Sequence, residues 1–380
     1  MTKLEKLIQE LCPEGVEYIP ISEVTDYEQP SKYIVKSTDY SDDFDIPVLT
    51  AGQTFILGYT NETDGIYEAS KEDPVIIFDD FTGAFKWVDF PFKVKSSAMK
   101  IIHAKSAKTT IRYLFHIMGN IGFSSDEHKR LWISVYSGIK IPVPPLPVQA
   151  EIVRILDNFT ELTAELTAEL TARKKQYEYY KNTLLLNNPL SEMKPLSDIG
   201  PVSMCKRIMK AQTSSSGDVP FYKIGTFGKT PDAFISQELY EQYKEKYSYP
   251  NKGDILISAA GTIGRTVIFD GNPAYFQDSN IVWIENDESL VLNQYLYYCY
   301  QLQPWQAATG GTISRLYNDN IRKAKIPVPP LAEQERIVSI LDRFDTLCND
   351  ISEGLPAEIE ARQKQYEYYR DKLLTFKKLA

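Results

Sequence analysis

The stretch Ile141–Phe159, IPVPPLPVQAEIVRILDNF, returns as Ile326–Phe344, IPVPPLAEQERIVSILDRF, later in the same chain. A second pair follows it: KKQYEYYKNTLL at Lys174–Leu185 matches QKQYEYYRDKLL at Gln363–Leu374. Repetition over roughly half the chain indicates a duplicated structural unit. With 380 residues, the chain suits two domains that each bury a core of their own.

Each copy continues into a segment with helical spacing of apolar residues. Apolar residues recur at spacings of three, four and six, at Leu156, Phe159, Leu162, Leu166 and Leu170, which predicts a helix over residues 148–186. The second copy predicts a helix over residues 333–379, kinked or broken at Gly354 and Pro356. Helices this long have little core of their own, so we expect the two to pack on each other. The Ile-Pro-Val-Pro-Pro-Leu run before each helix is expected to be a stiff polyproline-type connector, because it cannot continue a helix or a central strand.

The blocks upstream of these helices indicate α+β domains. Apolar runs predict strands, a glycine-rich segment predicts a tight turn, and helical spacing marks the end of each block. The expected elements are strands 74–78, 254–258 and 266–270, a turn at 259–264, and helices 109–120 and 292–303. The scaffold repeats and the loops differ, which is expected if each block presents its own binding surface.

Bulk composition narrows the classes of function. Cys12, Cys205, Cys299 and Cys348 are scattered and lie apart from the three histidines, so neither a zinc site nor a disulfide framework is expected. No apolar run is long enough to cross a bilayer, and residues 1–15 lack the pattern of a signal peptide, which predicts a cytoplasmic protein. The net charge of −9 argues against a general polyanion binder.

One segment departs from this acidic balance. Residues 86–112 hold seven lysines or arginines, and Asp89 is the one acidic residue among them. Together with the neighbouring aromatic residues, this segment either contacts phosphates or forms the solvated face of a strand.

These features resemble the specificity subunits of Type I restriction-modification enzymes, over essentially the whole chain. The resemblance is strongest in GGTISRLYNDNIRKAKIPVPPLAEQERIVSILD at Gly310–Asp342, in the LISAAGTIG turn at Leu256–Gly264, and in the duplicated helix. It implies two target recognition domains held apart by two antiparallel helices with pseudo-twofold symmetry. Each domain would read one half of a bipartite, asymmetric DNA site, and the repeated helices would dock two methylation subunits. Restriction subunits would join the full complex.

The resemblance also implies domain boundaries. Target recognition domain 1 is expected at residues 1–146, the first spacer helix at 147–190, target recognition domain 2 at 191–331, and the second spacer helix at 332–380. The helix predicted over residues 2–11 resembles the ends of the repeated helices, so the N-terminus is expected beside the C-terminus. Two similar blocks would offer equivalent surfaces to two copies of one partner.

No catalytic set is recognisable, so the chain is expected to be non-catalytic. Asn272-Pro273-Ala274-Tyr275 lacks the second proline of an amino-methyltransferase tetrapeptide and is expected to be a turn. Gly261–Gly264 lacks the lysine of a P-loop. S-adenosylmethionine, ATP and Mg²⁺ are expected on partner subunits, by family resemblance, and no cofactor or metal is expected in this chain.

Candidate DNA contacts are polar or basic residues in or beside expected loops, where they could reach phosphates or base edges. Each could instead be a surface residue or make a turn hydrogen bond. They are Thr82, Lys86, Lys93, Lys95 and Arg130 in the first block, and Lys223, Ser258, Thr262, Arg265, Thr312, Arg315 and Asn318 in the second. Two other functions stay open: a non-enzymatic coiled-coil adaptor with two protein-binding domains, and a stand-alone DNA methyltransferase.

The two spacers differ in one respect. Thr163–Leu166 and Thr167–Leu170 are consecutive Thr-Ala-Glu-Leu units, and the spacing from Asp157 to Gln176 is four residues shorter than that from Asp342 to Gln365. Four helical residues span about 6 Å, comparable with one or two base-pair rises. The sequence therefore predicts that these units set the gap between the two half-sites.

Overall fold

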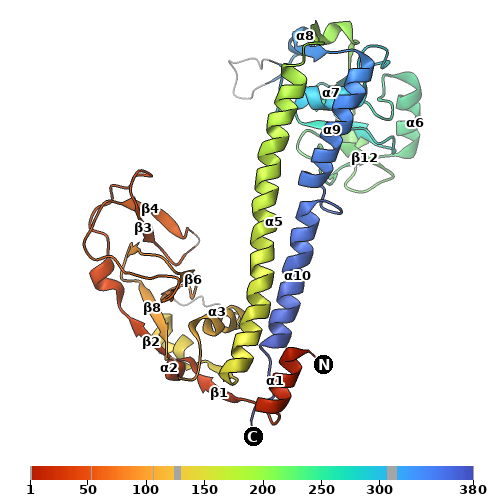
Figure 1. Ribbon diagram of the computed structural model, residues 1–380. Helices are drawn as coiled ribbons and strands as arrows, with labels where there is room; N and C mark the ends of the chain where they lie inside the picture. The colour runs from red at the N-terminus through yellow and green to blue at the C-terminus, as the bar shows by residue number, and fades with distance from the viewer. Residues whose placement is uncertain (1, 53, 106, 124–129, 306–314, 380) are drawn as a thin grey trace. The chain divides into compact units, whose positions relative to one another are not determined.

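The computed structural model describes residues 2–52, 54–105, 107–123, 130–305 and 315–379. The chain divides into two compact units, unit 1 (Met1–Thr167 with Glu358–Ala380) and unit 2 (Ala168–Ala357). Helices and sheets are mixed in both (Figure 1). Within the described ranges, no helix is both long and apolar enough for a bilayer span.

Unit 1 is built on two sheets of orders β2-β8-β5-β6 and β4-β3-β7. Their strands are β2 (Thr25–Glu28), β3 (Ile46–Leu49), β4 (Ile56–Thr60), β5 (Val75–Asp79), β6 (Phe85–Val88), β7 (Lys93–Val94) and β8 (Met99–Ala104). The strand expected at residues 74–78 is confirmed as β5. It reads as a continuous apolar run because Ile76 and Phe78 enter one core cluster while Val75 and Ile77 enter another.

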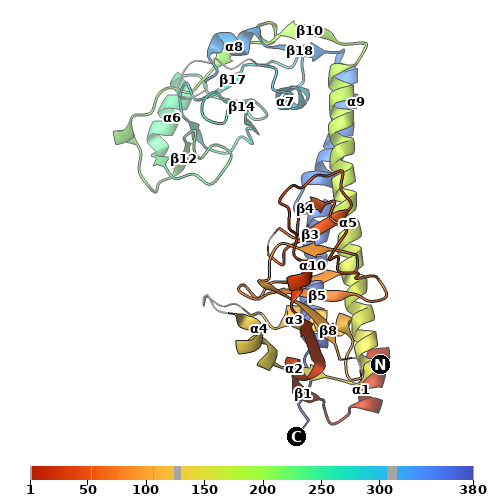
Figure 2. The same cartoon turned by 90° about the vertical axis from the view of Figure 1, so that its left-hand side faces the viewer.

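Unit 2 repeats this plan, with sheets of orders β11-β17-β14-β15 and β13-β12-β16. The strands are β11 (Val202–Ser203), β12 (Val219–Tyr222), β13 (Phe234–Ile235), β14 (Ile255–Ser258), β15 (Thr266–Ile268), β16 (Tyr275–Phe276) and β17 (Ile281–Ile284). The predicted strands at 254–258 and 266–270 are confirmed as β14 and β15. In both views α6 (Gln237–Lys246) lies beside β12, and its Tyr240 shares a core cluster with Phe221 (Figure 2).

The proline runs differ from expectation. In each copy the Ile-Pro-Val part is a strand: β9 (Lys140–Val143) pairs with β1 (Glu17–Pro20), and β18 (Lys325–Val328) pairs with β10 (Glu192–Pro195). The prediction of a connector without strand pairing was wrong for these residues. Each sheet has only two strands, so every strand is an edge, where a proline without an N–H group is tolerated.

The long helices match their predictions closely. Helix α5 (Leu146–Leu186) is one uninterrupted helix, and the second copy is divided into α9 (Leu331–Asn349) and α10 (Leu355–Leu373). The break falls at Gly354, where an added Cβ would lie 2.4 Å from the carbonyl oxygen of Thr346. Helix α10 ends earlier than the expected residue 379.

Aromatic stacking holds the helices together within each unit. In unit 1, the rings of Phe159 on α5 and Tyr369 on α10 stack with centroids 5.4 Å apart. In unit 2, Tyr180 on α5 and Phe344 on α9 stack at 5.6 Å. The predicted packing of each spacer helix against part of the other copy is therefore confirmed inside both units.

The two termini of the chain meet in unit 1, as predicted. Helix α1 (Lys3–Leu11) is capped by Thr2, and beyond it the N–H of Val16 donates to the carbonyl of Lys377 at 2.9 Å. The N–H of Leu379 in turn donates to the carbonyl of Val16, also at 2.9 Å. The C-terminal residues are thus held beside the N-terminal strand (Figure 1).

The helix near the end of each block is hydrogen-bonded to the strand that precedes the long helix. The helices expected near the end of each block are confirmed as α3 (Ile111–Asn120) and α7 (Asn293–Gln301). Tyr113 on α3 donates its hydroxyl to Pro142 at 2.9 Å, and Tyr295 on α7 donates to Pro327 at 3.0 Å. The shorter helices are α2 (Ile21–Val24), α4 (Leu131–Ser134) and α8 (Asn318–Lys323).

Candidate nucleic-acid interface

A polar hollow of about 600 Å³ opens on unit 2, where β12 and β16 end. Four basic side chains line it, against one carboxylate. The lining residues are Arg207, Ile208, Lys210, Thr213, Phe221, Lys223, Gln277, Asp278, Ser279, Asn280 and Arg315. The structure thus brings together two of the predicted contacts, Lys223 and Arg315. Guanidinium and ammonium groups around one hollow suit a phosphate backbone, and the two amides suit base edges.

Arg315 is held in position by the loop that follows β16. Its Nη2 donates to the carbonyl of Ser279 at 3.3 Å and to Oδ1 of Asn280 at 3.2 Å. Ser279 has a φ of 59°, in the left-handed region that residues other than glycine rarely adopt. The guanidinium therefore sits half-buried with a fixed orientation, and its other nitrogens have no partner among the described residues.

Two of the other cations of the hollow, Arg207 and Lys223, are held by ion pairs. Arg207 lies 2.9 Å from Asp278, and Lys223 lies 2.8 Å from Asp232. The Lys223 and Asp232 side chains are 42% and 58% exposed, so this pair contributes little stability and Lys223 can turn to a phosphate.

Gln277 was not predicted from the sequence, nor were Arg207, Lys210 and Asn280. The Oε1 of Gln277 accepts the N–H of Ile224 at 2.9 Å, and its Nε2 has no partner in the described part of the chain. The sequence carried a weak signal for the two cations, since residues 206–210 hold three basic residues. It carried none for the two amides.

The glycine turn between β14 and β15 is confirmed, and it changes the interpretation of two predicted contacts. Ser258 is 2% exposed, donates to the carbonyl of Thr262, and accepts the N–H of Arg265 at 2.8 Å. Arg265 in turn donates to the carbonyl of Phe227 at 2.8 Å. Ser258 is therefore the buried last residue of β14, with its hydroxyl bonded inside the turn, which corrects the expectation of an accessible loop residue. Arg265 braces the turn, and Thr262 is exposed at its tip.

The last two predictions for unit 2 have different outcomes. Asn318 is exposed at the start of α8, three residues after Arg315. Thr312 lies outside the described residues.

In unit 1 the structure corrects one predicted contact. Lys93 is 1% exposed, and its Nζ lies 3.0 Å from a Glu62 carboxylate oxygen and donates to the carbonyls of Asp64 and Gly65 at 2.5 and 3.2 Å. The Lys93 side chain is therefore buried in the protein interior. Whether a side chain on β7 faces solvent depends on which part of the chain covers that strand. Elsewhere in the basic segment, Lys100 is also buried.

The other unit 1 candidates lie near the surface on separate elements. Thr82 is exposed in the turn after β5, where its N–H donates to Asp79 at 2.8 Å, and Lys86 is half-buried on β6. Lys95 is exposed directly after β7, and Arg130 is exposed directly before α4.

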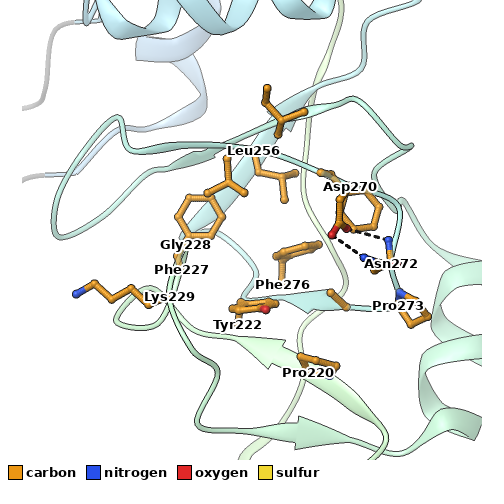
Figure 3. Close-up of a pocket in the computed structure, with 14 residues that line it drawn as sticks. Pro220, Tyr222, Phe227, Gly228, Lys229, Leu256, Asp270, Asn272, Pro273 and Phe276 are labelled. Atoms are coloured by element: carbon orange, nitrogen blue, oxygen red, sulfur yellow. Dashed lines mark hydrogen bonds between the residues drawn. The ribbon is translucent and has the colours of Figure 1, made fainter. Parts of the chain in front are cut away.

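A second hollow in unit 2, of about 310 Å³, is mainly apolar (Figure 3). The rings of Tyr222 and Phe276 stack inside it with centroids 5.8 Å apart. At its edge the Asn272 side chain donates to Asp270 at 2.7 Å, and its backbone N–H donates to the same carboxylate at 2.9 Å. Asn272 and Pro273 thus belong to a turn, as expected, and Tyr275 is fully buried in β16.

The four cysteines are buried and carry free thiols. Burial raises the pKa of the Cys205 and Cys299 thiols to about 12. A thiol with so high a pKa is a poor nucleophile and a poor metal ligand at neutral pH.

The chain is similar to specificity subunits of Type I restriction-modification systems over nearly its whole length. A family model for the Type I restriction modification DNA specificity domain matches residues 13–173 and again residues 190–361. A putative type I restriction enzyme specificity subunit of Haemophilus influenzae is 51% identical over 389 residues, covering 99% of this chain and 98% of that protein. The specificity subunit of a Type I restriction enzyme of Escherichia coli is 44% identical over 402 residues, covering 100% and 98%. The crystal structure of the S subunit of a Type I system from M. genitalium covers 95% of this chain and 96% of its own, with a TM-score of 0.58 at 13% identity, so the fold is shared.

Proposed function

Because this chain belongs to the family of Type I restriction-modification DNA specificity subunits, we propose that each of its two units reads one half of a bipartite, asymmetric DNA site. The chain itself performs no chemistry in this proposal. It selects the adenines that partner subunits methylate, or directs restriction when a site is unmodified.

The observation that carries this proposal is the hollow of unit 2. It places Arg207, Lys210, Lys223 and Arg315 around the amides of Gln277 and Asn280. Cations bind the phosphate backbone and set the register, while amides distinguish bases by their hydrogen-bonding edges. The whole chain is acidic, so we expect the lone chain to bind DNA weakly and partner subunits to complete a positive clamp.

The repeated helices supply the docking surface for partners. Tyr179 on α5 and Tyr368 on α10 come from the two copies of the same QYEYY motif, and they are 66% and 62% exposed. The same aromatic surface offered twice suits two copies of one methylation subunit. S-adenosylmethionine would then be held by those subunits, and ATP and Mg²⁺ by restriction subunits, in a cytoplasmic complex.

The test is to coexpress the chain with its methylation subunit and to map methyladenine across a genome by sequencing. We expect one bipartite motif with a constant gap, and no methylation by the chain alone. Arg315→Ala should reduce methylation of that motif, whereas Lys246→Ala, an exposed lysine at the end of α6, should leave it unchanged. Methyl transfer by the purified single chain, or methylation without a bipartite motif, would contradict the proposal.

A further inference from the structure

The two units contain one structurally equivalent point, at the end of their parallel strand pair. In unit 1 the pair ends at Leu49 and Val94, and in unit 2 at Tyr222 and Phe276. The residue that follows the second strand donates its N–H back across the pair in both cases, over 3.1 Å in unit 1 and 2.9 Å in unit 2. These following residues are Lys95 and Gln277.

A second backbone contact confirms the correspondence. Three residues after Lys95, the carbonyl of Ala98 accepts the N–H of Asp80 at 3.0 Å. Three residues after Gln277, the carbonyl of Asn280 accepts the N–H of Ala259 at 2.7 Å. The loop that leaves the parallel pair therefore has the same length and the same attachment in both units.

A third contact shows that Arg130 and Arg315 hold equivalent positions in the two units. The N–H of Leu131 donates to the carbonyl of Asp80 at 2.7 Å, and the N–H of Leu316 donates to the carbonyl of Ala259 at 2.8 Å. Arg130 and Arg315 immediately precede these leucines. In unit 2 this arginine lines the basic hollow together with the residue that follows the parallel pair.

Lys95 and Gln277, at the equivalent point, each have a side-chain hydrogen-bond donor that is available to a ligand. The Lys95 ammonium is exposed, lying 3.2 Å from the Tyr40 hydroxyl and 5.6 Å from the centre of its ring. The Gln277 amide is oriented by the N–H of Ile224 on its oxygen, which leaves Nε2 without a partner in the described residues. Both positions are thus preorganised on the scaffold rather than carried on a free loop.

We propose that Lys95 and Gln277 are specificity-determining residues, each reading a purine of its own half-site in the major groove. A lysine donates to O6 and N7 of guanine, and the amide of glutamine pairs with N6 and N7 of adenine. Lys95 therefore reads a guanine in the half-site of unit 1, and Gln277 reads an adenine in the half-site of unit 2. This inference rests on the proposed function and adds the residues and base types to it.

The test exchanges the two residues in the full chain, coexpressed with the methylation subunit, and maps methyladenine. Lys95→Gln should lower methylation of sites with the original guanine by about 5- to 150-fold relative to sites with another base at that one position. Gln277→Lys should lower methylation of sites with the original adenine of the other half-site by a similar factor, relative to sites with another base at that position. The second half-site and the gap should stay as in the parent chain in each case.

Two matched variants control for charge and folding. Lys71→Gln in unit 1 and Gln242→Lys in unit 2 make the same exchanges at exposed positions away from these loops, and should not alter the motif. If an exchange prevents copurification with the methylation subunit, Lys95→Ala and Gln277→Ala carry the test, because each removes the donor and should relax the preference at one base.

Two results would overturn the inference. A uniform fall in methylation at every sequence would mean that the residue contacts phosphate only. An unchanged motif in variants that still methylate would mean that it contacts no base. Either result leaves a bipartite motif in the parent chain, whereas failure of the proposed function would remove that motif from the parent itself.

Discussion

The ammonium of Lys100 lies 2.9 Å from the carboxylate of Asp80, and both side chains are closed off from solvent. The other carboxylate oxygen of Asp80 accepts the N–H of Trp132 at 2.8 Å. At the equivalent positions unit 2 holds Ala259 and Val282 in place of this pair. One scaffold therefore accommodates either an ion pair or apolar residues at the same place.

We predict that breaking this pair on one side is costly. Asp80→Ala or Lys100→Val leaves one buried charge without its partner, and each should lower the free energy of unfolding by about 3 to 5 kcal/mol. The double variant installs the two residues that unit 2 uses and should recover most of the loss, short of the lost Trp132 contact. Denaturant unfolding followed by tryptophan fluorescence measures this. A double variant no more stable than the singles would contradict it.

A buried glutamine at the start of each long helix gives a second prediction. Gln149 and Gln334 are fully buried, and each donates Nε2 to a proline carbonyl at 2.8 Å, Pro144 and Pro329 respectively. Replacing either glutamine by leucine should cost about 2 to 4 kcal/mol, since buried backbone groups lose their partners. The two losses should be similar because the contacts are similar. Thermal unfolding of Gln149→Leu and Gln334→Leu tests this, with unequal losses as the contrary result.

Acid sensitivity follows from Glu151. Hydrogen bonds from Arg154 and then from Lys3 lower the pKa of this carboxyl to about 2, although its side chain is only 3% exposed. A carboxyl with a lowered pKa in the folded state stabilises it above about pH 4.5, and this contribution disappears as the pH falls towards 2. Glu151→Gln should therefore flatten the acid side of the stability curve, whereas Glu10→Gln, exposed on α1, should not. Unfolding midpoints between pH 6 and pH 2 provide the measurement.

The Thr-Ala-Glu-Leu units give a prediction about spacing. They lie within α5, where the hydroxyl of Thr163 donates to the carbonyl of Phe159 at 2.8 Å. Deleting Thr163–Leu166 removes about 6 Å of helix and should shorten the gap of the DNA site by about one base pair, with both half-sites retained. Methyladenine mapping of the deletion variant tests this. Thr163→Ala, which removes the hydroxyl but no length, should leave the gap unchanged, and an unaltered gap in the deletion would refute the idea.

In the basic segment 86–112, the local sequence pattern could not predict which lysines are exposed. Lys93 and Lys95 stand two residues apart and had equal standing as predicted contacts. Lys93 is buried against Glu62, while Lys95 is exposed. Strand alternation places residues two apart on one face, but β7 ends at Val94, and only the chain packed over each residue decides its exposure.

The sequence alone determined the features that local physics controls. The repeat, the extent of α5, the break at Gly354 and the glycine turn before β15 follow from periodicity and backbone freedom within a few residues. Tertiary structure decided which polar residues work together. Gln277 and Arg315 line one hollow although they are far apart in the sequence, because the pairing of distant strands places their loops side by side. Such pairing depends on long-range contacts, which no spacing within one segment reveals.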